Sequence, residues 1–321
     1  MRMRRETVSI FGLACSIVIA QTVALFLSPF FIAMNARAFD DPNNVANPVI
    51  YIILILVFTA LILGIVRMRK KNIVKYIVLG AMFLSMIIVF FVPVWLGLLL
   101  VPMAEDVQGN LAFVLSVVIS ALITYALVKK PEWYVVDAVG ICVAAGVTAI
   151  MGISFSILPA LLLLIGLAVY DAISVYKTKH MVTLADAVAS EKLPILLVVP
   201  KKLDYTMEGQ KSLKEQIASG EEREAMFMGL GDMIIPGVLV VSALASNVDR
   251  IDTLVFGISA PLLVSLGTMI GGLVGFSVLM RFVTRGNPQA GLPLLNTGAI
   301  LGYIITYYIV FRDLTFGVRF G

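Results

Sequence analysis

Two aspartates, Asp171 and Asp232, stand in stretches of the chain that are otherwise apolar. Of the 20 acidic residues, only these two and Asp137 fall inside apolar runs long enough to cross a membrane. An acid in the bilayer centre costs about 2.5–3.5 kcal/mol, so a retained one indicates function. Two facing carboxyls share one proton and titrate as a unit. The ionised member can take a proton from water while the protonated member hydrogen-bonds to a carbonyl, which predicts amide hydrolysis without a metal.

The positions of the two acids predict that they face each other. Asp171 lies about five residues before the end of the apolar run 158–176, and Asp232 lies about seven residues after the start of the run 225–245. Consecutive spans run in opposite directions, so at 1.5 Å per residue both carboxyls would lie roughly 8–10 Å below the same membrane surface. Two antiparallel helices would therefore bring the pair together across their interface.

The residues around the acids fit such a site. The stretch MGLGDMIIPG places Gly229 and Gly231 beside Asp232, where the missing side chains would let another backbone come close. Pro236, four residues after the acid, has no N–H for the Asp232 carbonyl, which predicts a loosened or kinked helix. Tyr170 adds a ring with a hydroxyl next to the first acid.

The elements that carry these residues are expected to be membrane-spanning helices. Hydrophobic residues make up 60% of the 321 residues, well above the roughly 45–50% of soluble domains. A helix needs about 20 apolar residues to cross the bilayer. The sequence predicts an all-α polytopic membrane protein of nine transmembrane helices, over residues 8–32, 48–66, 73–100, 111–128, 133–151, 158–176, 225–245, 261–282 and 292–311.

Two further features inside the spans are expected to be structural. Asp137 lies about four residues inside the run 133–151, near a pair of lysines, so a structural role is the simpler interpretation and a supporting role at the site stays open. Gly267, Gly271 and Gly275 form a repeated small-residue face, which predicts close helix packing.

The basic residues predict the direction of the chain. With a cytoplasmic N-terminus and an outside C-terminus, cytoplasmic segments hold all but four of the 24 Lys and Arg residues, which satisfies the positive-inside rule. The net charge of +4 then reflects topology, and no nucleic acid is expected. Residues 1–176 form six spans ending with the first acid, 177–224 a cytoplasmic loop with a possible short strand, and 225–321 three spans that include the second acid.

Other features narrow the class of protein. The start, MRMRRETVSIFGLAC, has the pattern of a secretory signal, but its apolar run continues to about Ile32, which favours a retained span over a cleaved signal. Cys15 and Cys142 lie in apolar runs, and His180 is the one histidine. We therefore expect no disulfide framework, metal site or cofactor.

The stretch LPILLVVP, residues 193–200, is an apolar island in the long loop. Its bounding prolines and β-branched end predict a short strand or a membrane-surface patch. It either packs against the bundle or offers an edge to an unwound substrate. Amide hydrolysis would need such an edge, because the backbone of a helix is sheltered by its own hydrogen bonds.

The sequence resembles the GxGD intramembrane aspartyl proteases, the group of presenilins and signal peptide peptidases. The resemblance rests on the dipeptide YD at 170–171, the motif GLGD at 229–232 and a proline-led start of the last span, and it extends over the nine-span plan. The stretch LAVYD is closer to the presenilin form. The chain departs from the family's Pro-Ala-Leu signature, since it reads PLL at 293–295.

The resemblance implies an aspartic endopeptidase that cuts transmembrane helices, with Asp171 and Asp232 as catalytic residues. Its substrates would be transmembrane proteins with a cytoplasmic C-terminus, and an oligomer is compatible with it. The chain's size suits a prokaryotic presenilin homologue, which would place it in the plasma membrane. The supporting and substrate-binding residues implied are Tyr170, Gly229, Gly231, Pro293, Leu294 and Leu295.

Two other classes of function remain open from the residues alone. A secondary transporter or cation channel could use the acids as ion or proton ligands, although such proteins usually carry inverted repeats and the sequence shows no convincing internal repeat. A non-catalytic membrane scaffold would leave the buried acids unexplained. Cleavage of a labelled transmembrane substrate separates the protease from both.

Overall fold

The computed structural model describes residues 2–68, 71–130, 132–178, 196–201, 225–255, 257–284 and 289–318. Nine α-helices are present in these ranges: α1 (Arg2–Ala33), α2 (Ala46–Arg67), α3 (Lys71–Leu98), α4 (Glu105–Lys129), α5 (Trp133–Ser154), α6 (Ile157–Ile173), α9 (Leu230–Ala245), α10 (Ala260–Val283) and α11 (Gly291–Phe311). The shorter elements are the π-helical turn η1 (Ser174–Thr178), the 3₁₀ turn η2 (Val248–Arg250) and the strands β1 (Leu196–Pro200), β2 (Ala225–Gly229), β3 (Leu254–Val255) and β4 (Ile258–Ser259).

The helices match the expectation of a polytopic membrane protein. In the described part of the chain, eight helices are long and apolar enough to cross a bilayer. Helix α9 is apolar but has 16 residues, below the length of a full span. Helices α5 and α6 are separate, as expected, and the break falls at Phe155 and Ser156. The predicted helical fold is therefore present.

The predicted run 225–245 is not helical throughout, which corrects the sequence-based boundary. Its first five residues form β2, and the helix begins at Leu230. An apolar run does not distinguish strand from helix by itself. Here the backbone of β2 pairs with β1, a partner that the local sequence does not reveal. Asp232 consequently lies at the third residue of its helix.

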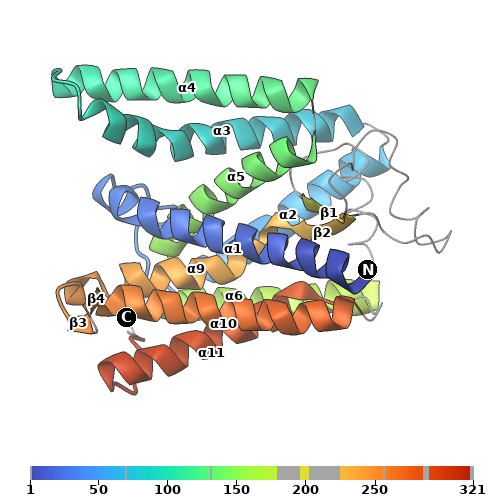
Figure 1. Cartoon of the computed structure of the whole chain (residues 1–321), viewed down its shortest axis with the longest axis vertical. Coiled ribbons are helices and arrows are strands. Elements are labelled where there is room, and N and C mark those ends of the chain that lie inside the picture. Colours follow the sequence, from blue (N-terminus) through green and yellow to red (C-terminus); the bar gives the residue numbers. More distant parts are fainter. Residues whose placement is uncertain are drawn as a thin grey trace. The chain divides into compact units, whose positions relative to one another are not determined.

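The described chain divides into two compact units. The first contains α3, α4 and the first part of α5, together with β1 and β2. Helices α3 and α4 lie side by side (Figure 1). Strands β1 and β2 are antiparallel, with Leu196 opposite Gly229 and Pro200 opposite Ala225. The chain segments before and after residues 202–224 are thereby joined in one two-stranded sheet.

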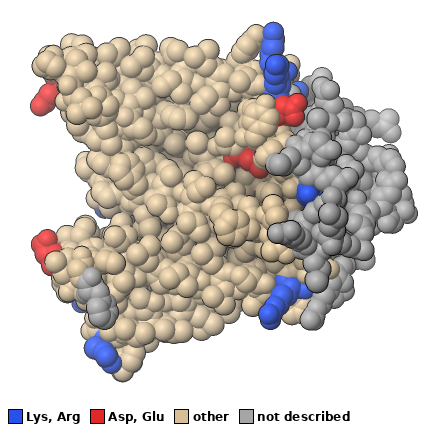
Figure 2. Space-filling model, in the orientation of Figure 1, with Lys and Arg blue, Asp and Glu red and all other residues tan. Residues whose placement is uncertain are grey.

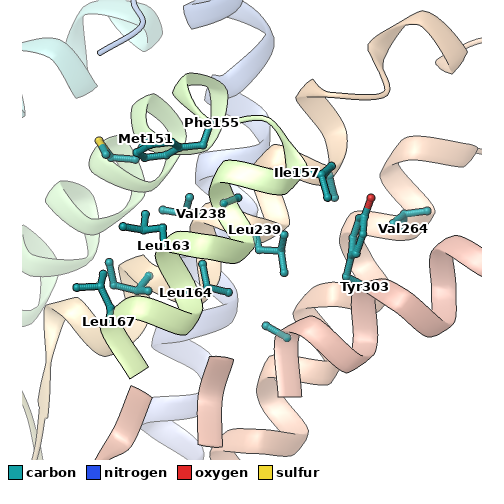
Figure 3. Close-up of a cluster of buried hydrophobic side chains, with 14 of the residues drawn as sticks. Met151, Phe155, Ile157, Leu163, Leu164, Leu167, Val238, Leu239, Val264 and Tyr303 are labelled. Carbon is teal, nitrogen blue, oxygen red and sulfur yellow. The ribbon is translucent and has the colours of Figure 1, made fainter. Parts of the chain in front are cut away.

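The second unit contains the elements that bear both acids, α6 and α9, together with α10 and α11. Its core joins these helices. Figure 3 shows Leu163 and Leu164 of α6 near Val238 and Leu239 of α9, all fully or almost fully buried. Burial of such aliphatic side chains contributes about 1.5–3 kcal/mol each in a soluble protein. In a bilayer the same contacts act mainly through close packing.

Glycines bring α10 and α11 into backbone contact, as predicted for the face of Gly267, Gly271 and Gly275. A Cβ atom on Gly271 would lie 2.7 Å from the Cα of Gly302, and a Cβ on Gly275 would lie 3.2 Å from the Cα of Leu295. Real Cβ atoms essentially never come within 3.0 Å of another heavy atom. Only glycine therefore permits this helix separation at Gly271.

Charged side chains on the described surface lie mostly near the ends of the helices. Figure 2 shows a broad uncharged area between them on the face that is drawn. Large apolar residues such as Phe11, Leu54 and Leu122 are more than half exposed. An apolar surface of this extent is unfavourable in water and suits contact with lipid.

Candidate active site

Asp171 caps the start of α11 from a neighbouring helix. Its side chain is only 5% exposed, and its Oδ2 atom accepts a hydrogen bond of 3.1 Å from the Leu292 N–H. The first amides of a helix have no partner inside the helix, and the residue before α11, Ala290, makes no side-chain cap. A carboxylate from α6 supplies what the local sequence lacks.

Asp232 lies against the residue that precedes Leu292. A Cβ atom on Gly291 would be 3.2 Å from Cγ and from both carboxyl oxygens of Asp232. A side chain there would crowd the carboxyl group. Because Gly291 has no side chain, the Asp232 carboxyl has room beside the backbone of residue 291. Because consecutive Cα atoms are about 3.8 Å apart, carboxyls that adjoin Gly291 and Leu292 belong to one site.

The chain of α6 and η1 holds the start of α11 at two further points that the sequence reasoning missed. After Asp171 in the chain, the Tyr176 hydroxyl lies 2.7 Å from Oε1 of Gln289. Before it, the Leu164 carbonyl accepts a hydrogen bond of 2.8 Å from Nδ2 of Asn296, which is 1% exposed. A buried amide in an apolar helix was the available sequence signal for Asn296. The pairing of Tyr176 with Gln289 has no local signal.

The predicted supporting residues occupy different surroundings. Tyr170 is half-buried on α6. It directly precedes Asp171, and consecutive residues on a helix do not share a face, so Tyr170 does not point to the same side of α6 as Asp171. Gly229 ends β2 opposite Leu196. At Gly231 the expected close approach of another backbone is not present, because a Cβ atom there would meet nothing within 4 Å in the described chain. Among the described residues, none fills the space beside Gly231.

The PLL segment lies in the first turn of α11, packed on α10. A Cβ atom on Gly275 would lie 3.1 Å from the Leu294 carbonyl carbon, and Leu295 is 1% exposed. The Pro293 carbonyl accepts a hydrogen bond from the Thr297 hydroxyl at 2.6 Å. Pro293 has no N–H, so residue 293 itself adds no unpaired donor to the first turn of α11. The segment fixes where the Gly291 and Leu292 amides point.

Asp137 belongs to the other compact unit, on α5. Its side chain is 9% exposed, and Oδ1 accepts a hydrogen bond of 2.8 Å from the Val198 N–H of β1. Asp137, which with Asp171 is one of two buried acids in the described chain, therefore has a backbone partner in the loop strand.

No group of three or more His, Cys, Asp or Glu side chains suited to a metal ion lies within the described ranges. What the arrangement offers chemically is a pair of carboxyls beside a helix N-terminus, in an apolar surround.

Comparisons with known proteins show the family of this chain. Residues 14–312 match the model of the family described as "Signal-peptide peptidase, presenilin aspartyl protease". A solved structure of a presenilin family intramembrane aspartate protease, in space group C222, has 34% sequence identity and a TM-score of 0.64, covering 94% of this chain and 99% of the other. A P2 crystal form of a protein of the same description has 34% identity and a TM-score of 0.63, covering 93% and 97%. The search of curated proteins gave no match.

Proposed function

Because the chain belongs to the family of signal peptide peptidases and presenilin aspartyl proteases, and is an intramembrane aspartic endopeptidase, we propose that Asp171 and Asp232 are its catalytic pair. The observation that carries the proposal is their meeting at the start of α11. One carboxyl accepts the Leu292 N–H and the other lies against Gly291. Tyr170, Gly229, Gly231 and the PLL segment at 293–295 would support the pair or contact substrate.

The proposed reaction needs one proton on the two carboxyls. The ionised carboxyl takes a proton from water, and the water oxygen adds to the carbonyl carbon of the peptide bond. The protonated carboxyl donates to the carbonyl oxygen and stabilises the tetrahedral intermediate. The C–N bond then breaks, the amine leaves with a proton, and the pair again holds one proton. The amides of α11 at Asp171 favour negative charge at this place.

The buried location of Asp171 suits this chemistry. An apolar site strengthens electrostatic interactions and keeps bulk water from the pair. Water must still reach the carboxyls. Gly231 directly precedes Asp232, and no atom of the described chain fills the space that a side chain at Gly231 would take. We infer that water or the opened substrate backbone occupies that space during catalysis. The transporter and channel alternatives do not fit the family.

We further infer nine spans, with α9 crossing as a short helix that β2 extends, a cytoplasmic N-terminus and an outside C-terminus. The basic residues support this direction, because all but four of the 24 lie on the cytoplasmic side under it. In a prokaryotic cell the membrane would be the plasma membrane. Residues 179–195 and 202–224 of the proposed cytoplasmic loop lie outside the described residues.

The function predicts a bell-shaped dependence of cleavage rate on pH. The doubly protonated pair has no base and the doubly ionised pair has no acid, so activity requires the singly protonated form. We expect the kcat/KM of the purified protein on a labelled transmembrane substrate to fall on both sides of an optimum. The mass of each product should place the cut inside the apolar segment. A rate that rises steadily with pH and never falls would contradict a shared proton.

The proposed topology predicts a preferred substrate direction. With the N-terminus inside, α6 runs inward and α9 runs outward, which gives the aspartyl pair a defined polarity. Substrates with an outside N-terminus and a cytoplasmic C-terminus should be cut toward the cytoplasmic half. Two substrates of one sequence, reconstituted in opposite orientations, provide the measurement. Equal cleavage, or preference for the cytoplasmic N-terminus, would refute the orientation and leave the catalytic pair intact.

A further inference from the structure

Asp137 is a buried acid that the proposed reaction does not use. It is the fifth residue of α5, and its Oδ1 accepts the Val198 N–H at 2.8 Å. Val198 itself is 2% exposed. Burying a carboxyl in a helix that faces lipid is costly unless it is well hydrogen-bonded. The hydrogen bond between Asp137 and Val198 is therefore expected to have a role that an apolar residue at position 137 could not fill.

The hydrogen bond between Val198 and Asp137 holds the edge of β1 that faces away from β2. In an antiparallel ladder, the backbone N–H and C=O groups of consecutive residues point to opposite sides of the strand, so those of alternate residues such as Val198 and Pro200 point to the same side. Since the Val198 N–H bonds to Asp137, it does not bond to β2. At the end of the same strand, the Pro200 carbonyl accepts a hydrogen bond from the Ser9 hydroxyl at 3.2 Å, and Pro200 has no N–H.

Strand β1 is thus held on both edges from Val198 to Pro200. Strand β2 takes one edge, and α5 with α1 takes the other. A salt bridge of 3.5 Å between Lys201 and Glu6 continues the contact with α1. This favours the packed interpretation of residues 193–200 over an edge that is open to substrate, for the described part of the segment. The strand behaves as a fixed element.

The same face of α5 also holds the residue that leads into the second catalytic acid. A Cβ atom on Gly140, one helical turn after Asp137, would lie 3.2 Å from Leu230 and 3.5 Å from Leu197. Leu230 is the first residue of α9, two residues before Asp232. The hydrogen bond at Asp137 and the packing at Gly140 therefore fix both β1 and the junction of β2 with α9.

We propose that Asp137 is a positioning residue, whose carboxyl anchors β1 to α5 and thereby sets the path of the chain through β2 to Asp232. The proposal rests on the proposed function for its effect on cleavage. The anchor needs only a hydrogen-bond acceptor, so an amide oxygen at residue 137 serves as well as a carboxyl. A third carboxyl that exchanged protons with the catalytic pair would instead need its acidic group. The two roles separate at Asp137→Asn.

The experiment compares Asp137→Asn and Asp137→Leu with the wild-type protein. Hydrogen–deuterium exchange of peptides that cover β1 and β2 is measured without substrate, and kcat/KM is measured with it. Asp137→Leu is expected to raise exchange in these peptides about tenfold or more. It should also lower kcat/KM by about 10- to 100-fold, since misplacement of a reacting group by 1 Å can cost this much. Asp137→Asn should retain wild-type exchange and activity within about threefold.

Ser9→Ala is the matched control, because it removes a neutral contact at the end of the same strand and should change kcat/KM less than threefold. If Asp137→Leu does not fold, replacing the Val198 amide by an ester removes the donor alone and should reproduce the loss. Unchanged exchange in the folded Leu or ester variant would overturn the anchor. Loss of activity in Asp137→Asn equal to that in Asp137→Leu would overturn it in favour of a titrating role. The exchange result holds whether or not the assignment of the catalytic pair survives.

Discussion

Asparagine in place of either Asp171 or Asp232 is expected to lower cleavage of a transmembrane substrate by about 10³-fold or more. A positioned general acid or base contributes roughly 10²–10⁴-fold. In the proposed reaction the two groups share one proton, so loss of either one disables both steps. Asparagine has nearly the same shape as aspartate but cannot exchange a proton at neutral pH. The measurement is kcat/KM of the purified variants in lipid vesicles, with product mass as the check on the cleavage position.

The fold should survive these two substitutions. At residue 171 an asparagine side-chain oxygen can still accept the Leu292 N–H that Asp171 accepts at 3.1 Å. Thermal stability and elution in detergent are therefore expected to match the wild type. Asp40→Asn changes an exposed acid before α2 and serves as the matched control with full activity. Activity within tenfold of the wild type in either catalytic variant would remove the proposed pair.

Leucine in place of Gly271 is expected to separate α10 from α11 and to lower activity by about 10²-fold. A Cβ atom there would lie 2.7 Å from the Cα of Gly302 and would also meet the Gly298 carbonyl. Backbone atoms cannot turn aside as a flexible side chain can, so one helix has to move. The start of α11 carries the Gly291 and Leu292 contacts to both acids, and a shift of 1 Å there can cost about 10²-fold in rate.

The matched control for this prediction is Gly80→Leu in α3. A Cβ atom at Gly80 would meet nothing within 4 Å in the described chain, and leucine is the better helix former. We expect Gly80→Leu to keep wild-type yield and activity. Gly271→Leu should show reduced folded yield, a lower melting temperature and loss of cleavage by about 10²-fold. Wild-type activity in Gly271→Leu would show that the contact of these helices does not position the site.

The site residues that the sequence alone predicts are those whose side chains carry a large free-energy cost in an apolar run. An acid in an apolar run is expensive wherever the run ends up, and this cost alone singles out Asp171, Asp232 and Asp137 among the acidic residues. The fixed rise of a helix then predicts the depth of Asp171. It does not give the depth of Asp232, because residues 225–229 form a strand and the helix begins only at Leu230. Glycines spaced by four residues predicted a closely packed face on α10, because such spacing lets helix backbones approach, but they did not identify α11 as the partner.

The parts that did not follow depend on partners distant in the chain. The run that begins at Ala225 is as apolar as the helix after it, and only pairing with Leu196–Pro200 makes its first five residues a strand. Nothing in the local sequence distinguishes Gly291 and Leu292 from their neighbours. Their importance comes from two carboxyls on other helices. The open side of Gly231 likewise depends on what surrounds it.

The cap that Asp171 places on α11 affects how mutational scans of this enzyme should be interpreted. An alanine at residue 171 removes a proposed catalytic group and also a helix cap, and loss of a cap commonly costs about 1 kcal/mol. An inactive alanine variant therefore confounds chemistry with misfolding, while the asparagine variant does not. The difference in melting temperature between the two variants would measure how far one side chain serves both catalysis and architecture. Inhibitors that displace the Asp171 carboxyl from Leu292 would likewise loosen the first turn of the last helix.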